Sequence, residues 1–210
     1  MQQPPKQKLS PEQLKVVTQK HTETLLDSLK KEESDNIKKV LKYKILTATS
    51  PLNKVGLNAL HTLASNQVNS EDQNKVEMHQ NCLASLQDYG LDINSMDYFG
   101  RNALHFAASV GNLVCLSALL NTDGCQVNAQ SIGGETALMK AIQHGNVPVV
   151  QLLLQHGASA NPNYVTSTGL NTQHFATQSA NQDIQSYIAQ VLEYEQASQQ
   201  LEGMEKPMSQ

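Results

Sequence analysis

Apolar residues along this chain fall into short blocks separated by polar turns, and the blocks repeat at a nearly constant distance. Three similar segments begin with glycine at positions 56, 100 and 134, and a weaker fourth begins at Gly169. The intervals are 134 − 100 = 34 and 169 − 134 = 35 residues, whereas the first, 100 − 56 = 44, is longer. A recurring period of this length predicts a stack of similar units, each built from two short helices.

Within each copy, the glycine segment is followed by a turn and a second apolar helix, as at 113–120 and 147–154. Pro148 suits the start of its helix, where no backbone N–H is needed. The copies end on glycine, a hydrophobic residue and asparagine, as at 124–128 and 157–161, and glycine accepts the left-handed backbone that ends a helix. The pattern predicts an all-α solenoid of helix–turn–helix units with short β-hairpin-like loops.

The repeated sequence motif resembles the ankyrin repeat, which has a period of roughly 33 residues and a T-P-L-H-x-A core. The match rests on Asn-Ala-Leu-His at 58–61 and 102–105 and on Thr-Ala-Leu-Met at 136–139. Alanine replaces proline in these copies, Met139 replaces histidine, and Gln173 stands in the fourth copy where leucine is expected. The resemblance implies a solenoid of about four to five ankyrin units at 51–197, with a degenerate or capping last copy.

Upstream, residues 10–50 are predicted to form N-terminal helices and a capping repeat. Ser10 and Pro11 read as a helix start, and a second start follows at Ser34. The two-helix layout at 22–47 lacks the hairpin signature and is interpreted as a cap with one polar face. The helix at 11–21 is either an extension of this cap or a separate partner-binding segment. Disordered and polar tails are expected at 1–9 and 198–210.

The additional length of the first repeat maps to the polar stretch 65–76. An insertion here forms a loop or lengthens the second helix, which is predicted at 73–88. Loops on a rigid scaffold often determine binding specificity, so the stretch is a candidate for a partner contact specific to this chain. The alternative is a tolerated insertion without a function in binding.

Charge is divided unevenly along the chain. Residues 1–60 hold 11 Lys and 6 Asp/Glu, a balance of +5, and residues 61–210 hold 4 Lys/Arg and 13 Asp/Glu, a balance of −9. The division indicates either a polarised binding surface or drift in surface composition. For the Lys-rich N-terminal end, an acidic protein partner is favoured over nucleic acid, because the lysines alternate with acidic residues and no stacking platform accompanies them.

The three cysteines, Cys82, Cys115 and Cys125, have no paired spacing and are expected to be buried free thiols. The first residues contain no apolar leader, and no apolar run approaches the roughly 20 residues of a membrane helix. These features lead us to expect a reducing, cytoplasmic location, with association with the cytoskeleton left open, and no contact with membranes.

Motifs of catalysis and metal binding were sought at their known spacings. The chain lacks the phosphate-loop, nucleophile-elbow and dinucleotide signatures, and its Cys and His spacings do not match a zinc site. We therefore expect no enzyme activity, cofactor or metal. His61, His105 and His174 share one repeat position, and the ankyrin resemblance implies that this histidine hydrogen-bonds backbone groups and ties one repeat to its neighbour.

Stacked repeats use their second helices for packing, so partner contacts are expected on the first helices and the hairpin tips. The candidate partner-binding residues are Tyr98, Phe99, Phe106, Val110, Ile132, Lys140, His144, Tyr164 and Phe175. An exposed aromatic line among them would be a binding hot spot; alternatively, Phe99 or Phe106 packs against the adjacent repeat. The expected function is a non-catalytic protein–protein interaction module, an adaptor or scaffold. The alternative is a structural subunit built permanently into a large assembly such as a cytoskeletal or ciliary complex.

Overall fold

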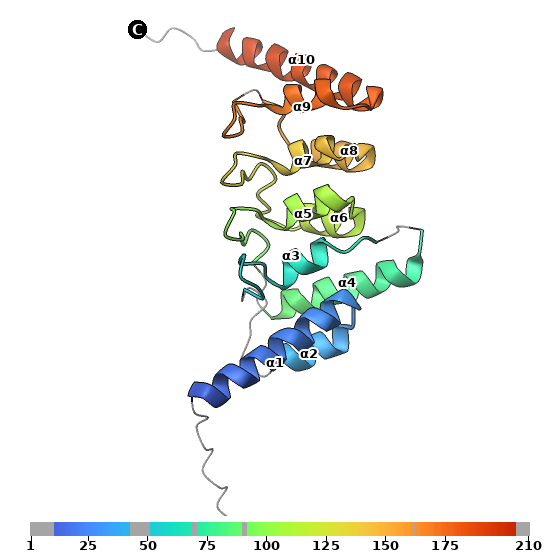
Figure 1. Cartoon of the computed structure of the whole chain (residues 1–210). Coiled ribbons are helices and arrows are strands. Elements are labelled where there is room, and N and C mark those ends of the chain that lie inside the picture. The colour runs from blue at the N-terminus through green and yellow to red at the C-terminus, as the bar shows by residue number, and fades with distance from the viewer. Residues whose placement is uncertain (1–10, 43–50, 69–70, 90–91, 162, 205–210) are drawn as a thin grey trace, which may run out of the picture.

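The computed structural model describes residues 11–42, 51–68, 71–89, 92–161 and 163–204. Its helices form one continuous stack, and loops project from one side of it (Figure 1). The helices in chain order are α1 (Pro11–Lys30), α2 (Ser34–Lys42), α3 (Ala59–Ala64), α4 (Gln73–Asp88), α5 (Ala103–Val110), α6 (Leu113–Leu120), α7 (Ala137–Gln143), α8 (Val147–Gln155), α9 (Thr172–Gln178) and α10 (Gln182–Met204).

The helices are arranged in two columns. The first helices α3, α5, α7 and α9 pack on one another next to the loops, and the second helices α4, α6 and α8 pack on one another on the opposite side (Figure 1). The pair α1 and α2 covers the N-terminal end against α3 and α4. The predicted all-α solenoid is confirmed.

The first helices begin at the same place in each repeat because the same side-chain cap recurs. The side-chain oxygens of Asn58, Asn102 and Asn171 each accept the backbone N–H of the histidine three residues later, at 3.1, 3.4 and 3.1 Å. Thr136 does the same for Met139 at 3.3 Å. An N-cap of this kind stabilises a helix by about 1 kcal/mol, so the repeated Asn/Thr-Ala-Leu core fixes where each unit begins.

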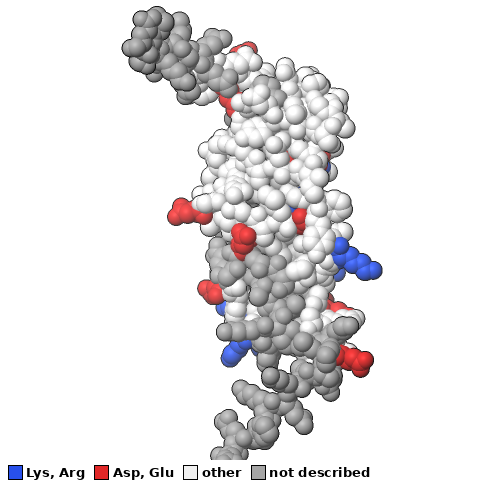
Figure 2. All heavy atoms as spheres, turned by 90° about the vertical axis from the view of Figure 1, so that its left-hand side faces the viewer, with Lys and Arg blue, Asp and Glu red and all other residues white. Residues whose placement is uncertain are grey.

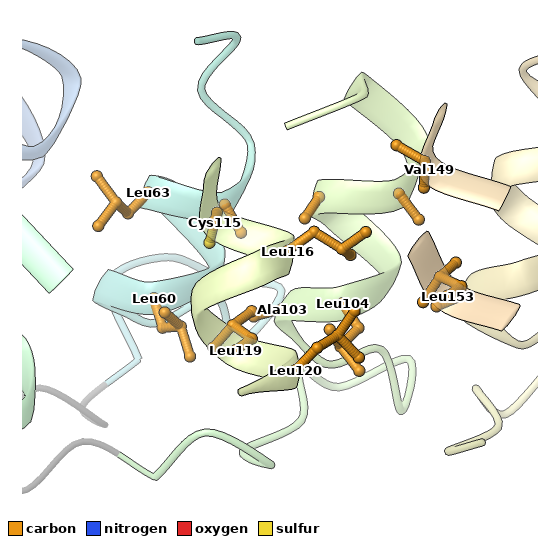
Figure 3. Packing of buried hydrophobic residues seen from close by; sticks show 14 of the residues in the cluster. Leu60, Leu63, Ala103, Leu104, Cys115, Leu116, Leu119, Leu120, Val149 and Leu153 are labelled. Carbon is orange, nitrogen blue, oxygen red and sulfur yellow. The ribbon is translucent and has the colours of Figure 1, made fainter. Parts of the chain in front are cut away.

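Small and branched apolar side chains fill the layers between the units. Leu60 and Leu104 from the first helices and Leu116 from α6 are at most 2% exposed, and Figure 3 shows them directed into the shared core. The alanines at the start of the first helices, Ala59, Ala103 and Ala137, are at most 1% exposed. Small residues at these points let neighbouring helices approach closely, which explains how the chain packs with few aromatics.

At the two ends, some helix bounds differ from the expected ones. Helix α1 is continuous from Pro11, so 11–21 is an extension of the first capping helix. Helix α2 begins at Ser34 as predicted and ends at Lys42. Residues 43–47 of the expected capping repeat and the expected tail at 1–9 lie outside the described residues. Helix α10 runs to Met204, so the first part of the expected tail at 198–210 is helical. None of the described helices is long and apolar enough to span a membrane.

The insertion in the first repeat forms both a loop and an added length of helix. Helix α4 has 16 residues, compared with 8 in α6 and 9 in α8, and it extends beyond both in Figure 1. Helix α4 also carries His79, which is fully buried and whose Nδ1 lies 2.9 Å from Oε1 of Glu32. Asn66, in the insertion, donates to the carbonyl of Leu29 at 3.0 Å. The inserted residues thus bind the cap to the first repeat.

Candidate partner-binding surface

The three hairpins that precede α5, α7 and α9 on the exposed side of the stack are closed by the same hydrogen bond. The backbone N–H of Asp97 donates to the carbonyl of Arg101 at 2.9 Å, and Ser131 and Thr166 donate in the same way to Glu135 and Leu170 at 2.9 and 2.8 Å. The side chain at the start of each hairpin also accepts a backbone N–H inside it; the oxygen Oδ1 of Asp97, for instance, accepts from Arg101 at 2.8 Å. The hydrogen bonds that shape each hairpin therefore join residues close together in the sequence.

Successive hairpins are joined to each other by backbone hydrogen bonds at equivalent positions. Tyr98 donates to the carbonyl of Val55 at 3.0 Å, Ile132 to Phe99 at 2.8 Å, and Ser167 to Gly133 at 2.8 Å. The hairpins approach so closely because glycine follows these tips. A Cβ on Gly56, whose φ is +81°, would lie 2.6 Å from the ring of Tyr98. The hairpins consequently form one continuous ribbon whose tips cannot move independently.

Apolar side chains are exposed along this ribbon. The exposed fractions are 76% for Ile132, 64% for Tyr98 and 53% for Phe99. We call the set the tip row, and it consists of Val55, Met96, Tyr98, Phe99, Ile132 and Val165. Figure 2 shows this side of the molecule, on which few charged side chains lie over the upper repeats. Exposed apolar residues that gather on one face indicate an interaction site.

Three members of the tip row, Val55, Met96 and Val165, were not among the candidate residues from the sequence. Repeat alignment contains the signal that could have found Val55, since it precedes Gly56 as Phe99 precedes Gly100. Val165 belongs to the hairpin tip at 163–165, of which Tyr164 is the candidate residue; Tyr164 is half-buried, whereas Val165 is exposed. A single valine or methionine is also less conspicuous than an aromatic residue, because isolated apolar residues on a surface are common.

Arg101, the one arginine of the chain, fixes the tip row to the inner helix α5. Its guanidinium carbon lies 5.1 Å from the centroid of the Phe99 ring and 4.7 Å from that of Phe106. The buried carboxylate of Asp97 accepts two of its N–H groups through Oδ2, at 2.9 and 2.7 Å. Cation–π contacts and paired charge-assisted hydrogen bonds hold this arrangement rigid without any bound partner.

The candidates on the inner helices are less exposed than the expected aromatic line requires. Phe106, Val110 and Phe175 are half-buried. The Phe106 ring meets the His61 ring edge-on with centroids 5.3 Å apart, which is the packing against the adjacent repeat that we left open. Phe175 packs against the core. For Phe106 the structure therefore shows the second of the two alternatives, packing against the adjacent repeat.

The polar candidates form a second, hydrophilic part of the surface. The Nζ of Lys140 lies 2.6 Å from Oε1 of Glu135, so a carboxylate already partners its charge. His144 is exposed, and its Nε2 lies 2.9 Å from Oγ of Ser109 in the preceding repeat. A depression of about 470 Å³ between the ends of α7 and α9 is lined by His144 and Gln178, among others. Polar partner groups can reach this part of the inner face.

The repeated histidines serve the architecture. The Nε2 of His61 contacts the carbonyls of Ser95 and Arg101, both at 3.1 Å, and that of His105 contacts Glu135 at 2.9 Å. Burial is the main cause that lowers the pKa of both rings, against the opposing effects of Asp97 on His61 and of Glu135 on His105. His174 lies exposed in the last repeat, where its ring contacts the cap Asn171.

The cysteines have little nucleophilic character. Burial raises the pKa of Cys82 and of Cys115 to about 12, with a smaller contribution from Glu32 at Cys82. Cys125 is half-buried, contrary to the expectation for this residue, and burial raises its pKa as well. A thiol with a raised pKa stays protonated at neutral pH and is a poor nucleophile or metal ligand. Among the described residues, there is no cluster of three or more His, Cys, Asp or Glu able to hold a metal ion.

Comparison with known proteins agrees with the repeated geometry. The sequence profile of ankyrin repeats in three copies matches residues 70–164 and 124–200, together more than half of the chain. The chain belongs to the ankyrin-repeat family. Ankyrin repeats are generally not catalytic, and their presence in this chain indicates a protein–protein interaction module.

Curated relatives share limited stretches with this ankyrin-repeat chain. It is 30% identical over 112 residues to the SMC5-SMC6 complex localization factor protein 1 of Bos taurus, which covers 48% of this chain and 11% of that protein. It is 29% identical over 125 residues to the ankyrin repeat and SOCS box protein 14 of Mus musculus, covering 55% and 19%. It is 37% identical over 76 residues to an L-asparaginase of Dirofilaria immitis, covering 36% and 13%. The matched region is less than a fifth of each relative.

Proposed function

We propose that this chain is a non-catalytic adaptor that binds a partner protein along the tip row, with the inner face beside it as the polar margin. The observation that carries the proposal is that Tyr98, Phe99 and Ile132 are exposed on hairpins joined to one another by backbone hydrogen bonds. Preorganised aromatic side chains lose little conformational freedom on binding, which makes them effective hot spots.

The cap is the second part of the proposed interface. Six lysines of α1, of α2 and of the turn between them are exposed: Lys20, Lys30, Lys31, Lys38, Lys39 and Lys42. We propose that they steer an acidic region of the partner toward the N-terminal end. The three free cysteines support a reducing, intracellular location for this encounter.

The test is affinity capture from native cell extract, with the full chain as bait at low and moderate salt and with quantitative mass spectrometry as the readout. The bait is compared with the triple variant Tyr98→Ala, Phe99→Ala and Ile132→Ala. Hot-spot residues contribute about 1–2 kcal/mol or more each, so we expect the triple variant to recover at least about tenfold less of a stoichiometric partner.

Met78→Ala is the matched control, because Met78 is 43% exposed but lies on α4, outside the tip row and outside the cap formed by α1 and α2. It should recover the partner like the unchanged chain. Equal recovery by the triple variant would exclude the tip row as the binding site. Recovery of many subunits together, resistant to salt, would instead support a fixed component of a large assembly.

A further inference from the structure

Helices α8 and α10 are neighbours at the C-terminal end of the stack (Figure 1), and a second apolar surface lies between them. It is a groove of about 390 Å³ that Leu154 and Ala158 line from the α8 side and Val191 lines from α10. Tyr187 and Tyr194 also line it and are 41% and 75% exposed. The groove and the tip row have no residue in common, and the hairpins and α8 lie on opposite sides of the stack (Figure 1). The proposed function does not use the groove.

Helix α10 has two apolar stripes; the stack covers one fully and the other only at its centre. Ile184, Ile188 and Leu192, at intervals of four residues, are at most 8% exposed and belong to the core. Tyr187, Val191 and Tyr194 repeat at intervals of four and three residues, which places them on a different, common face of the helix. This second stripe lines the groove: Val191 is half-buried against the core, whereas the rings of Tyr187 and Tyr194 on either side of it are exposed.

Glu195 lies at one side of the groove, and half of its carboxylate is engaged. Its Oε1 accepts hydrogen bonds from Oγ of Ser159 and from the backbone N–H of Ala160, both at 3.1 Å. Its Oε2 is buried and has no hydrogen-bond partner among the described residues. A buried carboxylate oxygen without a donor is unfavourable, which points to a donor that arrives with a ligand.

This part of the chain does not contain a cation that could serve as that donor. Residues 141–204 include Asp183, Glu193, Glu195 and Glu202 but neither Lys nor Arg. The field at the groove is therefore negative, and the donor that best complements it is a cationic side chain, which would form a charge-assisted hydrogen bond with Oε2. The apolar lining and the two tyrosines call for an aliphatic neighbour of that cation.

We propose that the groove between α8 and α10 binds a short segment of a partner protein in which an aliphatic side chain stands next to Lys or Arg. The aliphatic group packs on Leu154 and Val191 between the two tyrosines, and the cation pairs with Glu195. The chain then has two separate binding surfaces, at the hairpins and at the outer helices of the last two repeats, and can bridge two partners.

The probe is a random heptapeptide library displayed on phage and selected on the immobilised full chain. We expect enrichment of an aliphatic residue adjacent to Lys or Arg. An enriched peptide is then synthesised with a fluorophore, together with a version in which Gln replaces the cationic residue, and binding is measured by fluorescence anisotropy. Glu195→Gln should weaken binding of the cationic peptide about tenfold, since the pair loses a charge-assisted hydrogen bond, and should leave the Gln peptide almost unchanged.

The controls separate a specific pair from general charge and from folding. Glu195→Gln keeps an oxygen that can accept from Ser159 and Ala160, and Glu193→Gln makes the same charge change on an exposed residue of the same helix. Tyr194→Ala should weaken the peptide, whereas Tyr98→Ala, in the tip row, should not. The inference is overturned by an equal effect of the two glutamate variants, by enriched peptides without a cation, or by the absence of any Glu195-dependent peptide. Self-association of the chain that Tyr194→Ala abolishes in sedimentation would also overturn it, because the occupant would then be a second copy.

Discussion

The buried histidines His61 and His105 are held in their neutral form by two kinds of contact. The Nδ1 of each ring accepts the backbone N–H of its own N-cap residue, Asn58 or Asn102, at 3.1 and 3.2 Å. The Nε2 faces carbonyl groups of the next repeat and donates to them. The neutral tautomer with its proton on Nε2 satisfies both contacts; at His105, Nδ1 also lies 2.7 Å from Oδ1 of Asn102.

This arrangement predicts loss of stability in mild acid. Because burial lowers the pKa of both rings in the folded chain, the unfolded chain takes up protons first as the pH falls through about 6.5. Stability from these groups is thus complete above that pH and is lost below it. We expect the free energy of unfolding, measured by urea titration, to be lower at pH 5.5 than at pH 7.5.

The double variant His61→Met and His105→Met is the matched comparison, because Met139 occupies the same position in the third repeat and is 1% exposed. It should be less stable at pH 7.5, by about 1 kcal/mol for each lost hydrogen bond, but its stability should depend less on pH. An identical pH dependence in the two proteins would show that other groups control the acid sensitivity.

At the scale of the elements, the repeated segments were predictable because their determinants are local. The caps Asn58, Asn102 and Thr136 act on residues three positions away, so the sequence predicts α3, α5 and α7 directly. The pair of Glu32 and His79, 47 residues apart, forms only when the cap meets the lengthened α4. The contact of Phe106 with His61 likewise depends on how two repeats stack, and the half-burial of the inner aromatics could not be derived from periodicity.

The lengthened α4 should matter for the attachment of the cap. Glu32 adopts a positive φ of 56°, which is unfavourable for a non-glycine residue, and its side chain contacts both His79 and Asn66, at 2.9 and 3.3 Å. His79→Leu would leave this carboxylate without its main partner. We expect the free energy of unfolding to fall by about 1–3 kcal/mol, and amide hydrogen exchange to accelerate more in α1 and α2 than in α7.

Gln80→Leu is the control for this change, since Gln80 is the exposed neighbour of His79 on the same helix. It should alter stability by less than about 0.5 kcal/mol. If exchange in α1 and α2 responded equally to both variants, the contact between Glu32 and His79 could not be what attaches the cap.

The whole molecule is a one-dimensional stack, so the role of a repeat position depends on whether another unit covers it. Leu60, Leu104 and Leu138 occupy equivalent positions in α3, α5 and α7 and are 0%, 2% and 1% exposed. Gln173 holds this position in α9 and is exposed. The substitution that looks like degeneration in the sequence is thus a polar residue at an uncovered position, as the end of an array requires.

Restoring the repeat consensus with Gln173→Leu should therefore fail to stabilise the chain. A leucine there is not covered by any other described unit, so we expect a change in the free energy of unfolding within about 0.5 kcal/mol and more self-association in sedimentation velocity. The reciprocal change Leu138→Gln, which places an amide in the core, should cost about 3 kcal/mol or more. If the Gln173→Leu variant were monomeric and more stable by about 1 kcal/mol or more, this face of α9 would have to be covered in solution. The interpretation of Gln173 as a residue at an uncovered position would then be wrong.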